Sequence, residues 1–158
     1  MLATDATSVP LLSVDSRVAP LPNEAQHLLL SISLKTPQPI RILVVDDERA
    51  YLRLIALVLQ RYGYRVVTAT SGELALELAC EVDVALVDMM MPGMDGIETI
   101  QHLKWNNSTL NVIASSGCSE VDFRPELDRL GVEVFMAKPF PIEILLEKVD
   151  ELMEVAAV

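Results

Sequence analysis

The stretch ALVDMMMPGMDG, residues 85–96, decides the fold of this chain. The apolar run from Val82 to Val87 just overlaps it and predicts a short strand in a sheet that is covered on both faces. Asp88 follows at the carboxyl end of this strand, and the Pro-Gly pair soon after it predicts a loop. In open α/β sheets, ligands bind at the carboxyl ends of parallel strands, so Asp88 is the first candidate functional residue.

Strand-like and helix-like segments alternate from this stretch toward both ends of the chain. Short apolar, β-branched runs predict strands over residues 42–45, 64–69, 82–87, 110–114 and 132–137. Apolar residues at helical spacing predict helices over residues 48–62, 70–79, 97–103, 125–130 and 142–153. Strict alternation predicts parallel strands with right-handed crossovers, so we expect an α/β fold with a doubly wound five-stranded parallel sheet.

Several residues are typical of the ends of these helices. Gly63 is expected to end the helix before it in a left-handed conformation. Thr70 with Glu73 three residues later has the form of a capping box, which predicts a helix start. Residues 105–108 are polar enough to end the helix over 97–103, and Pro125 is expected at the first position of a short helix.

The composition limits the classes of partner. With 158 residues, the chain has room for one domain, and 51% hydrophobic but only 4% aromatic residues predict an aliphatic core. A net charge of -11 argues against binding to nucleic acid or an anionic membrane. Cys80 and Cys118 have neither metal-ligand spacing nor a disulfide framework, so we expect reduced thiols.

Residues 1–39 differ from the remainder, which we expect to form the domain over residues 40–158. They hold five of the nine prolines and no glycine, and they show no sustained periodicity. This composition predicts a flexible N-terminal extension. No signal peptide is recognisable, and the longest apolar stretch, Leu28 to Leu34, is too short to span a bilayer. We therefore expect a soluble, cytoplasmic protein.

Polar residues end four of the five predicted strands: Asp46 and Asp47, Asp88, Ser116, and Lys138. Each alone has a simple explanation. Asp47 can cap the following helix, Asp88 and Ser116 are common turn residues, and Lys138 can be a solvated strand end. Together, however, three acids, a hydroxyl and a base at one edge of a parallel sheet predict a site.

The chemistry of these groups favours phosphoryl transfer. Three crowded carboxylates repel one another, and a hard divalent cation such as Mg²⁺ relieves that repulsion. Mg²⁺ also leaves positions open for phosphate oxygens, so Asp88 can act as a nucleophile and become an aspartyl phosphate. Lys138 and Ser116 would then bind the phosphoryl oxygens that the metal does not hold.

Four motifs give the chain a family resemblance: VVDDE at 44–48, VDMMMPGMDG at 87–96, SG at 116–117 and FMAKPF at 135–140. With them, residues 41–153 resemble the receiver domain of two-component response regulators, including the single-domain chemotaxis type. The resemblance implies a flavodoxin-like (βα)5 fold with strand order 2-1-3-4-5.

The resemblance also implies a metal site and a phosphorylation site. Asp88 would be the phosphoacceptor. Asp46 and Asp47 would form the acid pair, with Asp47 the more direct ligand of Mg²⁺, and the backbone carbonyl of Met90 would complete the protein's share of the metal shell.

Further roles follow from the same resemblance. Ser116 would be the hydroxyl that follows the phosphoryl group, Lys138 the invariant lysine, and Phe135 the rotating aromatic residue of the switch. The Lys138-Pro139 peptide bond is expected to be cis.

Two positions depart from the family pattern. Met90 lies two residues after Asp88, where the family often has a polar side chain that influences loss of the phosphoryl group. Pro125 and the irregular residues 118–124 before it fall in the fourth-helix region, which in the family forms part of the partner-binding face.

The resemblance implies a signalling domain rather than an enzyme. A sensor histidine kinase, or a histidine phosphotransfer protein, would supply the phosphoryl group, and a protein partner would read the result. Because the chain ends after the predicted fifth helix, we expect output through protein contact, with no nucleic-acid or membrane partner. The alternatives are a pseudo-receiver that binds proteins without phosphorylation, and the receiver portion of a larger sensor-kinase system. A flavin-binding module and a haloacid-dehalogenase-type phosphatase fit less well: the first would need an anion-binding loop where Asp46-Asp47 stands, and the second an acid at Met90.

Overall fold

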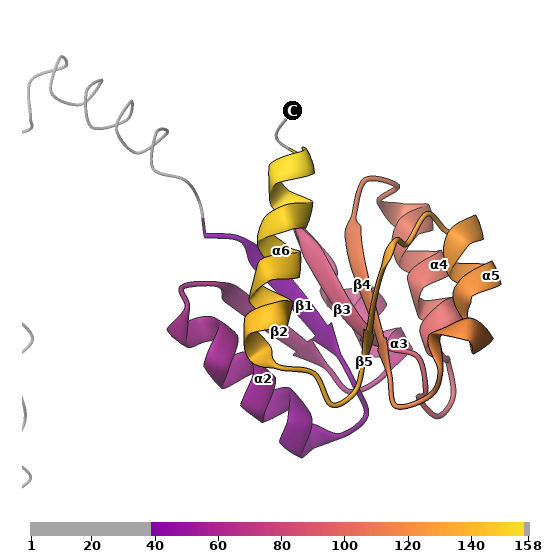
Figure 1. The fold of residues 1–158 in the computed structure, drawn as a ribbon, viewed down its shortest axis with the longest axis horizontal. Helices are drawn as coiled ribbons and strands as arrows, with labels where there is room; N and C mark the ends of the chain where they lie inside the picture. The colour runs from indigo at the N-terminus through magenta and orange to yellow at the C-terminus, as the bar shows by residue number, and fades with distance from the viewer. Residues whose placement is uncertain (1–38, 157–158) are drawn as a thin grey trace, which may run out of the picture. The chain divides into compact units, whose positions relative to one another are not determined.

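In the computed structural model, which describes residues 39–156, five parallel strands form one sheet in the order β2-β1-β3-β4-β5 (Figure 1). The strands are β1 (Arg41–Val45), β2 (Arg65–Ala69), β3 (Val84–Asp88), β4 (Asn111–Ser116) and β5 (Val134–Ala137). The register pairs Val45 with Val87, Asp88 with Ser115, and Ser116 with Ala137. The carboxyl ends of β1, β3, β4 and β5 therefore meet at one edge, and the predicted fold class and strand order are confirmed.

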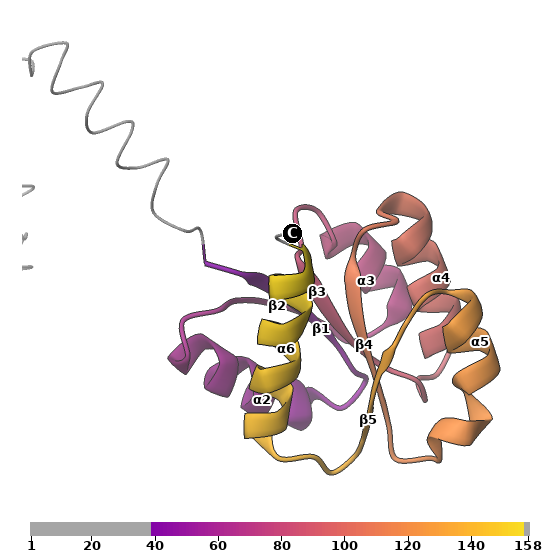
Figure 2. The same cartoon turned by 45° about the horizontal axis from the view of Figure 1, so that its top comes forward.

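Helices cover both faces of the sheet (Figures 1 and 2). They are α2 (Arg49–Arg61), α3 (Gly72–Leu78), α4 (Gly96–Asn106), α5 (Arg124–Arg129) and α6 (Ile142–Ala156), with a 3-10 turn, η1, at Glu120–Asp122. Buried side chains of α2 and α6, such as Leu59 and Leu145, pack on one face. Those of α3, α4 and α5, such as Ile100 and Leu127, pack on the other. The core is aliphatic, as the composition predicts.

The start of α3 corrects one prediction. The N-cap is Ser71 rather than Thr70, since Ser71 has an extended backbone and its Oγ accepts a hydrogen bond from the Leu74 backbone N–H at 3.3 Å. A capping box needs Glu at the third helical position, but Leu74 occupies that position here. Glu73 is one residue too early, so the predicted box is wrong.

The structure differs from the prediction at the ends of two elements and in one short segment. α4 runs through Trp105 to Asn106, because the Asn107 N–H still donates to the Leu103 carbonyl at 2.9 Å. β4 extends to Ser116, because pairing with β5 keeps its last residues in the sheet. Residues 120–122, expected to be irregular, form η1. The left-handed turn at Gly63 (φ +94°) is confirmed.

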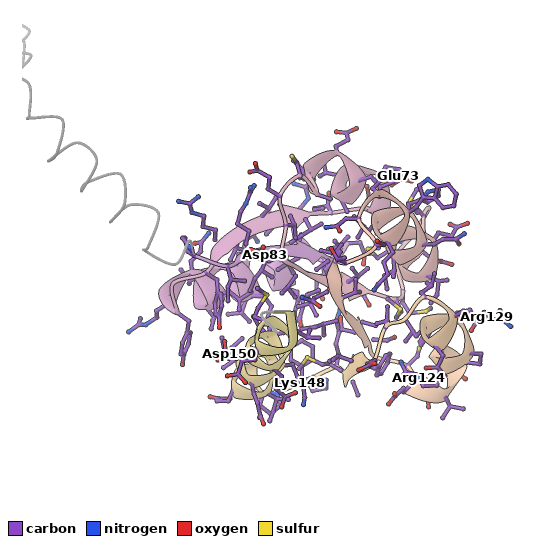
Figure 3. All side chains as sticks on the ribbon, turned by 90° about the horizontal axis from the view of Figure 1, so that it is seen from above. Glu73, Asp83, Arg124, Arg129, Lys148 and Asp150 are labelled. Carbon is purple, nitrogen blue, oxygen red and sulfur yellow. The ribbon has the colours of Figure 1, made fainter. Side chains whose placement is uncertain are left out.

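The acid inside the apolar run 82–87 has a structural explanation. Asp83 is exposed and directly precedes β3 (Figure 3), and its Oδ2 accepts a hydrogen bond from the Arg41 backbone N–H at 2.7 Å. Asp83 thus holds the start of β1 beside the start of β3. The carboxylate is tolerated because it lies just before the buried strand and not within it.

The remaining predictions about the whole chain have different outcomes. Cys80 and Cys118 are both exposed and form no disulfide. Within residues 39–156, no helix is both long enough and apolar enough to cross a bilayer. The predicted extension over 1–39 lies, apart from Pro39, outside the described residues.

Candidate functional site

The three predicted acids meet at the carboxyl edge of the sheet. Asp46 directly follows β1 and is 2% exposed, and Asp88 ends β3 and is 7% exposed. Asp47 is exposed. One carboxylate oxygen from each acid lies within 4.8 Å of the other two, because β1 and β3 are adjacent and in register. Two of the three carboxylates are thus buried, and a buried negative charge needs a partner.

Lys138 provides that partner from the loop after β5. Its Nζ lies 3.0 Å from Asp88 Oδ2 and also pairs with Asp46 Oδ2, and its side chain is only 20% exposed. Its backbone N–H donates to the Ser116 carbonyl at 2.7 Å, which fastens this loop to β4. The Lys138-Pro139 bond is cis, as expected. One ammonium group therefore bridges both buried acids.

Backbone amides orient the same two acids. Asp46 Oδ1 accepts the Glu48 N–H at 2.9 Å, and Asp88 Oδ1 accepts the Met90 N–H at 3.3 Å. Each buried acid thus uses one oxygen for backbone and the other for the lysine. Glu48, not Asp47, is the N-cap of α2, and it makes no side-chain cap bond. Among the described residues, Asp47 has no hydrogen bond or ion pair, so its carboxylate is available to a ligand.

The loop after β3 packs closely against Asp88. Met89 and Met91 are buried in the core, whereas Met90 is 58% exposed. A Cβ on Gly96 would lie 2.4 Å from the Asp88 carbonyl oxygen and 2.5 Å from Met89 Cα, so only glycine fits there without a backbone shift. Gly96 therefore lets α4 begin directly against the strand that carries the acid.

Ser116 and Phe135 lie on neighbouring strands, β4 and β5. Ser116 is fully buried, and its Oγ accepts the Cys118 N–H at 3.0 Å. Phe135 is half-buried and stacks on Phe123, with ring centroids 6.2 Å apart and an angle of 24° between the planes. Phe135 packs on the face covered by α3, α4 and α5. The two residues thus connect the acid edge with the region around η1 and α5.

Tyr51 is a residue of the site that the sequence does not predict, since its sequence position indicates only a place in the helix over residues 48–62. Its ring centroid lies 4.6 Å from Lys138 Nζ, and its ring meets Phe140 edge to face at 6.4 Å. Burial, followed by the charges of Asp46 and Asp88, raises the pKa of the Tyr51 hydroxyl above its ordinary value. The signal available was its place in the first turn of the helix that follows the acid pair.

Comparison with known proteins agrees with this geometry. Residues 42–150 match the family model of the response regulator receiver domain. The chain is 34% identical to sporulation initiation phosphotransferase F of Bacillus subtilis over 113 residues, which are 70% of this chain and 91% of that protein. Other relatives are longer: the chain spans 29% of a cyclic di-GMP phosphodiesterase of Thermotoga maritima, to which it is 33% identical over 108 residues, 68% of this chain.

Solved structures give the same result. The chemotaxis protein CheY4 of Vibrio cholerae superposes with a TM-score of 0.70 at 26% identity, over 73% of this chain and 99% of that one. The response regulator TrrA of Thermotoga maritima, in complex with Mg²⁺ and BeF, gives a TM-score of 0.64 at 32% identity, over 72% and 98%. Phosphorylation and Mg²⁺ binding are typical of this family, whose members act in two-component systems with histidine kinases or phosphotransfer proteins. The chain belongs to the response regulator receiver domain family.

Proposed function

We propose that this chain is a phosphoryl-accepting receiver that takes a phosphoryl group onto Asp88, with Mg²⁺, and thereby switches a protein-binding face. The donor would be the phosphohistidine of a sensor histidine kinase or of a histidine phosphotransfer protein. One observation carries the proposal: Lys138 Nζ pairs with both Asp46 and Asp88, while Asp47 adds a third carboxylate within 4.8 Å.

The donor atoms fit Mg²⁺. Three carboxylate oxygens within 4.8 Å of one another are hard ligands of the kind that Mg²⁺ prefers, and Asp47 is exposed. We propose that Asp46, Asp47, Asp88 and the Met90 carbonyl hold the ion. When bound, Mg²⁺ would neutralise charge on the phosphoryl oxygens. The relative TrrA, crystallised with Mg²⁺ and BeF, supports this assignment.

Three side chains of the site have separate roles in the proposed phosphoryl transfer. A carboxylate oxygen of Asp88 attacks phosphorus, so that a P–O bond forms while the P–N bond to the donor imidazole breaks and the imidazole leaves. Lys138, already 3.0 Å from Asp88 Oδ2, supplies positive charge for the phosphoryl oxygens. Ser116 Oγ only accepts in its bond with Cys118, so its hydroxyl hydrogen can be donated to a phosphoryl oxygen. The transfer is stoichiometric, so the chain acts as a signalling domain rather than as an enzyme.

Labelling with a small phosphodonor tests the proposed function. After incubation with acetyl phosphate and Mg²⁺, we expect intact mass spectrometry to show a gain of one phosphoryl group per chain. Excess EDTA should prevent the gain, because the metal would no longer offset charge on the donor oxygens. A chain that stays unmodified in Mg²⁺ would instead favour a pseudo-receiver that binds partners without phosphorylation.

We further propose that Ser116 and Phe135 carry the switch. If the Ser116 hydroxyl closes onto a phosphoryl oxygen, space opens beside the adjacent strand β5, into which Phe135 can turn. Phe135 has no hydroxyl, so its two positions differ in packing, including its stacking on Phe123. A differential interaction of about 1 to 3 kcal/mol would shift the populations usefully. The surface that changes would be formed by α5, β5 and α6.

Replacing Ser116 by Ala should separate phosphorylation from switching. The variant is expected to accept a phosphoryl group on Asp88, because the nucleophile and Lys138 remain, but to transmit it poorly. The measurement is the set of amide chemical shifts over residues 118–145 with and without beryllofluoride. Equal shift changes in wild type and Ser116→Ala would remove Ser116 from the mechanism.

A further inference from the structure

We infer that Tyr51 is a positioning residue for Lys138: its ring, braced by Phe140, holds the lysine ammonium over the buried pair Asp46 and Asp88. The inference rests on the proposed function, since Lys138 is the residue that would meet the phosphoryl oxygens. It assigns a role in the reaction to a side chain that carries no reacting group.

The ammonium of Lys138 is held from two sides. The Asp46 and Asp88 carboxylates contact Nζ on one side, and the ring of Tyr51 lies 4.6 Å from it on another. The face of an aromatic ring carries negative potential and attracts a cation at this distance. Because a lysine side chain rotates about four bonds, the carboxylates alone allow its methylene chain several conformations. The ring of Tyr51 reduces the number of these conformations.

Phe140 fixes the ring of Tyr51 in turn. The two rings meet edge to face, with centroids 6.4 Å apart and planes at 84°, a geometry that aromatic pairs prefer. Both also pack against the core cluster under α2 and α6. Phe140 lies two residues after Lys138, so the loop that carries the lysine also carries the brace. The ring thus ties this loop to the first turn of α2.

The contact depends on the ring and not on the hydroxyl. Among the described residues, the Tyr51 hydroxyl makes no hydrogen bond, whereas that of Tyr64 donates to Asp150 Oδ1 at 2.9 Å. We therefore expect Tyr51→Phe to keep the contact with Lys138 and Tyr51→Leu to lose it. A side chain loses rotamer freedom when it is ordered, so a lysine already confined in the resting protein reaches the phosphoryl oxygens at a lower entropic cost.

Three variants test this role: Tyr51→Phe, Tyr51→Leu and, as a control, Tyr64→Leu. Tyr64 is also half-buried and packs against the same core cluster, at the amino end of β2, so its replacement removes an aromatic ring from that cluster, together with the hydrogen bond to Asp150, away from Lys138. The first measurement needs no phosphodonor. A ring beneath the ammonium shifts the proton resonances of the Lys138 ε-methylene upfield. We expect this shift in wild type, Tyr51→Phe and Tyr64→Leu, and its loss in Tyr51→Leu.

The second measurement is the rate of Asp88 labelling as a function of acetyl phosphate concentration. Tyr51→Phe should label within about 2-fold of wild type, whereas Tyr51→Leu should lose about 5- to 30-fold in maximal rate, the range for a partly desolvated cation–π contact. Tyr64→Leu should label like wild type. The maximal rate should decrease, rather than the apparent affinity for acetyl phosphate, since Tyr51 acts on Lys138 at the transfer step.

Two results would overturn the inference: no upfield shift of Lys138 in wild type, or equal maximal rates for Tyr51→Phe and Tyr51→Leu in folded proteins. A wild-type chain that takes no phosphoryl group would overturn the proposed function and with it the role of Tyr51 in transfer. The ring-current comparison would still decide by itself whether Tyr51 holds Lys138, so the two failures are distinguishable.

Discussion

Replacing Asp88 by Asn is expected to reduce Mg²⁺-dependent labelling by acetyl phosphate to background. The amide has nearly the shape of the carboxylate, and its oxygen can still accept the Met90 N–H that now bonds to Asp88 Oδ1. It lacks the nucleophilic, charged oxygen that attacks phosphorus, however, and it no longer pairs with Lys138 Nζ as a charge. The measurement is the mass gain per chain over time, for wild type and variant side by side.

Asp95 offers a matched control seven residues further along the same loop. It is exposed and caps α4, since its Oδ1 accepts the Glu98 N–H at 2.9 Å. Asn caps helices about as well as Asp does, so Asp95→Asn should fold and label like wild type. An acid-labile phosphoryl group on Asp88→Asn, gained at the wild-type rate, would show that the acceptor lies elsewhere.

Replacing Asp47 by Ala is expected to weaken Mg²⁺ binding by at least about tenfold. The free energy of unfolding without metal should change by no more than about 0.5 kcal/mol, as for a surface position. Metal binding should change far more than stability because Asp47 is exposed and has no hydrogen bond or ion pair within residues 39–156. Asp46 and Asp88, by contrast, are buried and paired with Lys138. Removing Asp47 even relieves some repulsion among the three acids.

Thermal unfolding at increasing Mg²⁺ concentration measures this difference. A ligand that binds only the folded state raises its stability as the concentration exceeds the dissociation constant. The midpoint of wild type should therefore rise with Mg²⁺ at concentrations that leave Asp47→Ala unchanged. Glu77→Ala is the control for net charge, because Glu77 is an exposed acid on α3 that lies outside the acid cluster. Identical Mg²⁺ dependence in wild type and Asp47→Ala would contradict the assignment of Asp47 as a ligand.

The sheet and the acid edge could be predicted because both depend on local sequence. Alternating strands and helices leave a parallel sheet as the simplest arrangement, and a polar residue at the end of such a strand is then placed at one edge. Asp46, Asp47 and Asp88 were predicted to meet for this reason, and they do. The place of Lys138 at this edge follows from the same logic, since it directly follows β5, whereas its salt bridges with Asp46 and Asp88 are a finding of the structure.

The contacts that sequence reasoning missed depend on packing between distant elements. Tyr51 in α2 meets Lys138 and Phe140 in the loop before α6, and no periodicity shows which ring will face which ammonium. The start of α3 depended on a choice between two neighbouring hydroxyl residues, Thr70 and Ser71, which backbone conformation decided. N-cap propensity ranks Ser above Thr, but the spacing of Thr70 to Glu73 resembles a capping box and points to the wrong residue.

The most direct test of the account is to locate the phosphoryl group on the wild-type chain. Sodium borohydride reduces an aspartyl phosphate to homoserine, which peptide mass spectrometry assigns to one position. After incubation with acetyl phosphate and Mg²⁺, we expect that Asp88 is converted and that no conversion occurs in EDTA. Conversion at Asp46, Asp47 or any other acid in place of Asp88, or equal conversion of Asp88 in EDTA, would contradict a Mg²⁺-dependent phosphoacceptor at the end of β3.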